Sequence, residues 1–178
     1  MKFMIAAAAA LSLAGTAQAQ VGKPDLYGSL GYAKKEDSNL EAGQVRLGAR
    51  FSPYLGVEGE FALGTEPNTI TFPSVPPLVL KNQLRHELAV YGVGFYPVTP
   101  NFDVLARVGY GNTWLRRTFA TPPVVSVNKF DADSLNLGVG AQYLFDGKNG
   151  VRIDYLRQNY GKGLKDENGW AVAFTRRF

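Results

Sequence analysis

Seven charged residues recur in the sequence at spacings that would bring them together on the faces of β-strands. They are Arg46, Arg50, Glu58, Glu60, Arg107, Arg152 and Asp154. Alternate side chains of a strand point to opposite faces, so residues an even number of positions apart, such as Glu58 and Glu60, share one face. Opposite charges gathered on such a face can form a buried ion-pair network, or they can line a narrow polar passage for ions.

The segments that carry the first four of these charges are joined by residues 52–54, which have the composition of a tight turn. Counting outward from that turn places Arg46 opposite Glu60 and Arg50 opposite Gly56. Directly opposite and diagonal side chains interact across a strand pair. This arrangement therefore predicts ion pairs between the two strands.

His86 is the only histidine and the one candidate for acid–base catalysis. A catalytic histidine needs a nucleophile and an orienting acid within reach, but its neighbours are Arg85 and Glu87, and no serine is close in sequence. A transition-metal site needs several His or Cys ligands, and the sequence contains no cysteine. We therefore expect no enzymatic activity, no metal and no cofactor.

The elements that must position the charges are segments of alternating apolar and polar residues, rich in glycine. We predict eight strands, at residues 25–33, 44–51, 55–63, 84–96, 102–114, 134–145, 151–160 and 169–178. The connections alternate between short ones (52–54, 97–101 and 146–150) and long ones (34–43, 64–83, 115–133 and 161–168). All long connections then emerge at one end of an up-and-down meander, as they do in outer-membrane barrels.

Aromatic residues gather at both ends of the predicted strands. We predict that they form two membrane-interface belts, made of Tyr32, Phe51, Tyr54, Phe95, Phe102, Trp114, Phe145 and Trp170. A soluble barrel would direct its apolar residues into the lumen and hold its aromatics near mid-strand. Aromatic rings prefer a membrane–water interface, so two belts favour a barrel that spans a membrane.

The N-terminus has the three parts of a secretory signal peptide. Lys2 precedes an apolar run over 4–15, and Ala17-Gln18-Ala19 is an A-x-A cleavage site. We expect a signal peptide at 1–19 and a single barrel domain at 20–178. The net charge of +4 comes from scattered residues, without a basic cluster suited to nucleic acid.

With its signal ending in Ala17-Gln18-Ala19, its Gly- and aromatic-rich strands and its terminal Phe178, the sequence resembles the small outer-membrane β-barrels of Gram-negative bacteria, the OmpA-transmembrane-domain and OmpX type. The resemblance implies an all-β, eight-stranded antiparallel up-and-down transmembrane β-barrel in the outer membrane. It also implies contact with membrane lipid and lipopolysaccharide, and recognition by the barrel-insertion machinery. The implied insertion signal consists of Trp170, Val172, Phe174 and Phe178; Arg176 departs from it, because an aromatic is usual there.

The interior of an eight-stranded barrel is just wide enough to be filled by side chains. Charges placed there leave bulk water and must be paired. We therefore favour a structural plug of ion pairs over a narrow passage, and a porin-like channel for small solutes or ions is the alternative function.

The two longest connections, 64–83 and 115–133, share a theme of Thr-Phe followed by Pro-Pro and aliphatic residues. Such apolar tips either bind an extracellular partner or pack on each other above the barrel. The sequence thus predicts a barrel with a structural role in envelope integrity or an adhesion-type role through its loops. An outer-membrane lipid-modifying enzyme is the second alternative.

Overall fold

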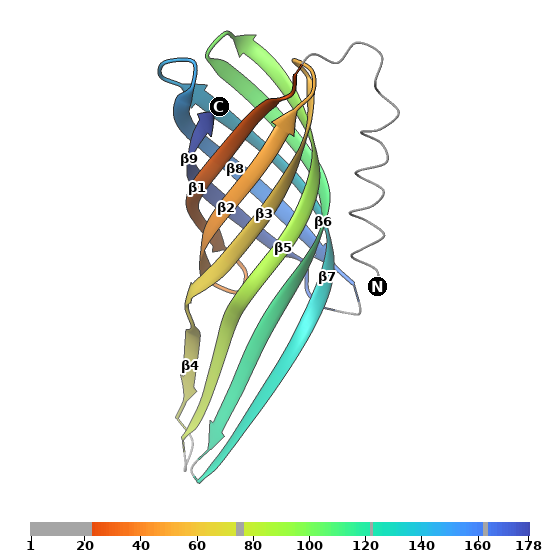
Figure 1. Cartoon of the computed structure of the whole chain (residues 1–178). Coiled ribbons are helices and arrows are strands. Elements are labelled where there is room, and N and C mark those ends of the chain that lie inside the picture. The colour runs from red at the N-terminus through yellow and green to blue at the C-terminus, as the bar shows by residue number, and fades with distance from the viewer. Residues whose placement is uncertain (1–22, 74–76, 122, 162–163) are drawn as a thin grey trace.

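The computed structural model describes residues 23–73, 77–121, 123–161 and 164–178, so the expected signal peptide lies outside the described residues. Within these ranges an antiparallel sheet closes into a barrel (Figure 1). Its strands are β1 (Asp25–Lys35), β2 (Leu40–Arg50), β3 (Leu55–Glu66), β4 (Asn68–Phe72), β5 (Leu78–Thr99), β6 (Phe102–Thr121), β7 (Val124–Leu144), β8 (Asn149–Tyr160) and β9 (Glu167–Arg177). No helix in the described part of the chain is long and apolar enough to cross a membrane.

The strand order is β3-β2-β1-β9-β8-β7-β6-β5-β4, and an additional pairing of β3 with β5 closes the ring. β4 pairs with β5 alone and continues the direction of β3 beyond the barrel (Figure 1). The wall therefore has eight strands, and each contains most of one predicted segment. The predicted antiparallel up-and-down barrel is confirmed.

Alternation along each strand separates the two surfaces of the wall. In β9, Ala171, Ala173 and Thr175 are buried, while Val172 and Phe174 are exposed. The same exposure of alternate large apolar residues recurs in the other wall strands, as Leu30, Leu47, Val108, Val139 and Ile153 show. Such an apolar outer face and a small or polar inner face is the pattern of a barrel that is solvated by lipid.

The predicted loops 64–83 and 115–133 are wrong as loops, because most of their residues are in strands. β5, β6 and β7 run for 22, 20 and 21 residues, and together with β4 they project beyond one end of the barrel (Figure 1). We call this projection the ribbon: β4 with residues 78–83, 115–121 and 124–133. Its many Val, Thr and Phe residues suit extended backbone, which explains the difference.

The two hairpins of the ribbon pair with each other through their backbones. Backbone pairing runs from Val79 opposite Ala120 to Leu84 opposite Leu115, so the hairpins share one continuous sheet. Phe72 and Val124 stay 45% and 66% exposed, whereas Leu80 and Phe119, which pair across this contact, are half-buried. The tip residues 74–76 and 122 lie outside the described residues.

At the opposite end the strands are joined by short turns. In the 146–150 turn, Gly147 has a φ of 76°, which favours glycine. The Asp146 carboxylate accepts hydrogen bonds from the backbone N–H groups of Asn149 at 2.6 Å and Lys148 at 2.9 Å. These hydrogen bonds, the Asn149 one first, lower the pKa of Asp146 to about 2.

Candidate functional site

A cluster of ion pairs fills the middle of the barrel, with Glu58 at its centre. Arg152 Nη1 lies 2.6 Å from Glu58 Oε2, and Arg107 Nη1 lies 3.1 Å from Glu58 Oε1. These three residues come from three different strands, β8, β3 and β6. None is more than 3% exposed, so the charges interact away from bulk water.

Glu60 and Asp154 complete this central cluster. Arg46 on β2 stands opposite Glu60, as the turn at 52–54 predicts, and the Arg46 Nε–Glu60 Oε2 distance is 2.6 Å. Arg46 Nη1 also lies 2.5 Å from Asp154 Oδ2. Three arginines and three carboxylates therefore balance, and the cluster joins four wall strands, β2, β3, β6 and β8. Its charges can stabilise the closed barrel only as a set, because each group depends on at least one partner.

Arg50, the remaining charge of the predicted set, belongs to a separate layer near the turn end. Its Nη1 lies 3.1 Å from Asp103 Oδ2. Arg177 and Gln142 contact the same oxygen at 2.7 and 2.8 Å. Asp103 is not among the seven charges that the sequence predicts for the network. The signal that could have found Asp103 is its position two residues after the predicted 97–101 turn, at the same end of the barrel as Arg50 and Arg177.

Phe95 was predicted to lie in the membrane-interface belt, and this prediction is wrong. Its ring is inside the barrel, 5% exposed, edge-on to Tyr27 at 6.1 Å and beneath the Arg50 guanidinium at 4.3 Å. Both faces of β5 carry apolar residues here, so alternation alone did not settle the facing. The next residue, Tyr96, is 68% exposed and takes the outward position.

The other predicted belt residues lie on the outer side of the wall or at its ends. Tyr54 and Phe145 are the most exposed of them, at 59% and 57%, and Tyr32 and Trp170 contact each other at 6.0 Å. Trp114 stacks on His86 at 4.5 Å. Phe51 is exposed, and Phe102 is half-buried.

Of the predicted insertion residues, Val172, Phe174 and Phe178 point outward and Trp170 is half-buried beside them.

The stacking on Trp114 places His86 at the outer surface of the wall and not in the central cluster. No group of His, Cys, Asp or Glu that could hold a metal ion occurs among the described residues. The residues that the structure brings together in the central cluster are charged, and each has a partner of opposite charge, which is the arrangement of a buried ion-pair network.

Sequence reasoning missed a second polar cluster, where the barrel opens toward the ribbon. Lys35 Nζ lies 2.8 Å from Glu87 Oε2, and Thr113 Oγ1 donates to the same carboxylate at 3.0 Å. Gln158 Nε2 donates to Glu87 at 2.5 Å, and Tyr160 lies 3.0 Å from Lys35. Lys35 falls just beyond the predicted strand at 25–33, and Glu87 lies on β5, where both faces carry apolar residues. Alternation therefore gave no signal for either residue.

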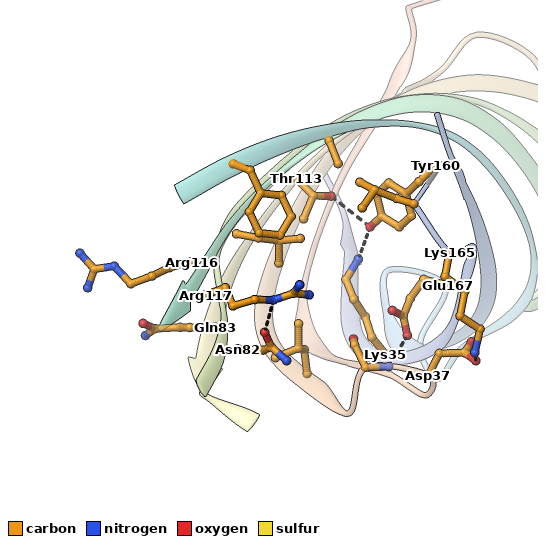
Figure 2. A pocket seen from close by; sticks show the side chains of 16 residues that line it. Lys35, Asp37, Asn82, Gln83, Thr113, Arg116, Arg117, Tyr160, Lys165 and Glu167 are labelled. Atoms are coloured by element: carbon orange, nitrogen blue, oxygen red, sulfur yellow. Dashed lines mark hydrogen bonds and ion pairs between the residues drawn. The ribbon is translucent and has the colours of Figure 1, made fainter. Parts of the chain in front are cut away.

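Lys35, Thr113 and Tyr160 of this mouth cluster line a cavity of about 210 Å³ at the base of the ribbon (Figure 2). Leu40, Leu115 and Phe130 contribute apolar walls. At the turn end, a second cavity of about 340 Å³ is lined by Arg50, Asp103 and Arg177. The central cluster lies between the two openings, so a solute that crossed the barrel would have to break its ion pairs.

Comparisons with known proteins agree with this architecture. The family described as outer membrane protein beta-barrel domain matches residues 3–178. Ail, the attachment invasion locus protein of Yersinia pestis, is 17% identical, with a TM-score of 0.63 over 88% of this chain and 100% of Ail. The N-terminal β-barrel domain of Pseudomonas aeruginosa OprF is 13% identical, with a TM-score of 0.55 over 88% and 99% of the two chains.

A major outer membrane protein from Thermus thermophilus is 12% identical, with a TM-score of 0.68 over 86% of this chain and 99% of that one. No curated protein sequence matches the chain. At these identities the structural likenesses show the fold alone.

Proposed function

The chain belongs to the outer membrane protein β-barrel family, and from this premise we propose that it is a non-catalytic barrel that contacts partners outside the cell through its ribbon. The observation that carries the proposal is the ribbon itself, which projects far beyond the wall (Figure 1). In barrels of this kind the long connections face the outside and the short turns face the periplasm. The barrel then serves as the anchor, with a structural role in the envelope.

The ribbon has an apolar face suited to recognition. Cross-strand pairing sets Ile70 opposite Leu80 and Leu80 opposite Phe119, with Phe72 and Leu78 as the next pair. Ile70 and Phe72 remain 41% and 45% exposed. Contiguous exposed apolar residues on a water-facing surface mark sites of interaction with other molecules.

The ribbon also offers backbone for strand addition. β8 pairs with β7 only from Ser134 onward, so within the described residues the 124–133 segment of β7 is paired on one side, by β6. An exposed edge of this length is a template for an extended peptide of a partner. Ail has been solved in complex with the heparin analogue sucrose octasulfate, and this supports the proposal that such barrels engage ligands outside the cell.

Shortening the ribbon tests the proposal. We expect that replacing residues 68–82 and 117–128, which are bounded by the paired residues Asn68/Asn82 and Arg117/Asn128, with Asn-Gly turns will leave the barrel folded. Binding of cells that carry the protein to host cells or matrix should be lost. Folding is read from heat-modifiable gel migration, and binding from an adhesion assay.

Single substitutions test whether binding depends on the apolar face of the ribbon or on its exposed backbone edge. Phe72→Ser should weaken adhesion, whereas Thr71→Ser on the opposite face of β4 should leave it unchanged. Wild-type adhesion of the shortened protein would contradict a recognition role. Loss of folding on shortening would instead make the ribbon a structural part of the barrel.

A narrow channel is the second candidate, because Gln44 Nε2 and Asn136 Oδ1 are buried polar atoms with no partner among the described residues. Such atoms are ordinarily satisfied by ordered water, which could mark a hydrated path. We expect no reproducible conductance steps from the wild-type protein in planar bilayers, because the central ion pairs close the lumen. Regular steps at several voltages would favour the channel, and lipid modification that is lost in His86→Ala would favour an enzyme.

We further propose that the outward residues Trp170, Val172, Phe174 and Phe178 form the insertion signal, and that the outer aromatics, Phe95 excepted, hold the barrel at the two membrane interfaces. The exposure of Val172, Phe174 and Phe178 supports the first role, and the exposure of Phe51, Tyr54 and Phe145 supports the second.

A further inference from the structure

The cavity at the base of the ribbon has the size and the lining of a site for a small molecule. Its volume of about 210 Å³ exceeds the roughly 150 Å³ of an apolar cavity that binds benzene in another protein. Its apolar lining consists of Leu40, Leu115, Phe130, Ala132 and Leu164. Largely apolar walls with a few polar groups are usual for ligand pockets. The cavity can therefore hold one aromatic ring or an aliphatic group of similar size.

The cavity is closed at its inner end. A smaller space of about 40 Å³ shares Lys35 and Leu40 with it and is also lined by Arg46 and Glu60 of the central cluster. That space has room for water but is too small for a ring. A molecule that enters from the ribbon side is therefore held in the cavity and does not pass through the barrel.

The polar groups at the inner end of the cavity bind one another. Lys35 Nζ lies 2.8 Å from Glu87 Oε2, and it donates to Gln158 and, at 3.0 Å, to Tyr160. These contacts use all three of its hydrogens. Thr113 donates to Glu87, and the Tyr160 hydroxyl donates to Gln158. Because the donors of Lys35, Thr113 and Tyr160 are in use, the polar group of a ligand would bind elsewhere in the lining.

Arg117 on β6 is a cation of the lining that forms no ion pair with the described residues. Figure 2 shows its side chain pointing into the cavity, and its Nε donates to Asn82 Oδ1 at 2.8 Å. Its guanidinium carbon lies 5.6 Å from the centre of the Phe130 ring. By contrast, Lys165 of the same lining pairs with Asp37 at 2.9 Å. The terminal nitrogens of Arg117 can therefore bind both oxygens of an acid group.

Other polar groups of the lining also favour an acid. Ser38 Oγ is buried and has no hydrogen-bond partner among the described residues, so it can donate to an acid oxygen. The two carboxylates of the lining do not occupy Arg117, because Asp37 pairs with Lys165 and Glu167 accepts from the Ser38 backbone N–H at 2.9 Å. The adjacent Arg116 points away from the cavity in Figure 2, which leaves Arg117 as the cation that faces a ligand.

We propose that this cavity binds a small carboxylate whose apolar body has the size of one ring. The body lies against Leu115 and Phe130, and the acid group binds Arg117. A purely apolar molecule would leave Arg117 unpaired, and a bare anion would leave the apolar walls in contact with water. A single unpaired guanidinium suits the single charge of a carboxylate. This site is separate from the recognition role of the ribbon and requires no assumption about which end of the barrel faces outside.

Titration calorimetry of the full-length barrel in lipid nanodiscs tests the proposal, with empty nanodiscs as the blank. The probes are phenylacetate, the uncharged phenylacetamide, and acetate, which lacks the ring. We expect phenylacetate to bind at least about tenfold more tightly than either of the others, and high salt to weaken its binding. Arg117→Gln should lower the affinity for phenylacetate at least about tenfold and leave that for phenylacetamide unchanged.

Arg85→Gln is the matched control, because it removes the same charge from an exposed residue outside the cavity lining and should bind as the wild type does. Phe130→Ala should weaken the binding of phenylacetate and phenylacetamide alike. Heat-modifiable gel migration verifies that each variant is folded, and Arg117→Gln at its exposed position decides the test if Phe130→Ala folds poorly. Equal binding of phenylacetate and phenylacetamide, or of phenylacetate and acetate, would overturn the proposal. So would heats no larger than those of empty nanodiscs, or an equal loss of affinity in Arg85→Gln.

Discussion

Replacing Glu58 with alanine is expected to lower the free energy of unfolding by about 3–5 kcal/mol, the cost of breaking a buried ion pair on one side. Glu58 accepts from Arg152 at 2.6 Å and from Arg107 at 3.1 Å, and its side chain is fully buried. The substitution removes both contacts and leaves a net positive charge in the middle of the barrel. The remaining carboxylates, Glu60 and Asp154, cannot balance three arginines.

Urea unfolding of the lipid-reconstituted barrel measures this effect, and Glu66→Ala is the control. Glu66 is exposed at the end of β3, so its loss should change stability by no more than about 0.5 kcal/mol. Wild-type stability of Glu58→Ala together with new conductance in planar bilayers would show that the central cluster gates a passage. A loss of stability without new conductance would agree with a central cluster that acts as a structural plug.

The parts of the fold that follow from local alternation were accessible from the sequence. Strict alternation in β2, β3 and β9 gave the facing of Arg46, Glu60 and Phe174, and the three-residue turn at 52–54 fixed the register of Arg46 against Glu60. A short turn leaves few registers open, and a shift of one residue would send every charge to the lipid face. The central cluster was therefore predictable in membership, although its pairings across distant strands were not.

Where alternation is weak, the sequence did not determine which face of the wall a side chain takes or which residues meet. β5 has apolar residues on both faces near Phe95, so its inward ring depends on contacts with Tyr27 and Arg50 from other strands. Lys35 and Glu87 meet only because closure of the barrel brings β1 and β5 to one opening. Prolines indicated loops at 64–83 and 115–133, but the β-branched residues between them favour strands, and pairing with neighbours extended them.

Closure itself depends on a pair of strands from the two ends of the chain, β1 and β9. Gly31 stands opposite Ala173 at this seam. A Cβ atom at residue 31 would lie 2.3 Å from the Val172 carbonyl oxygen and 2.6 Å from the Ala173 Cβ. These are backbone and near-backbone atoms, so no side-chain rotation can relieve the contact, and one of the two strands would have to move away.

Gly31→Val is therefore expected to destabilise the barrel by at least about 3 kcal/mol, at the upper end of what overpacking costs. Because the seam joins the first and last wall strands and is needed to complete the ring, the variant should also fold slowly and show a reduced fast-migrating band on unheated gels. Gly43→Val on the neighbouring strand β2 is the control, since a Cβ there meets nothing within 4 Å. Equal folding of the two variants would mean that the seam tolerates a wider spacing than the structure shows. Selective loss in Gly31→Val would establish that close packing between β1 and β9 holds the barrel shut.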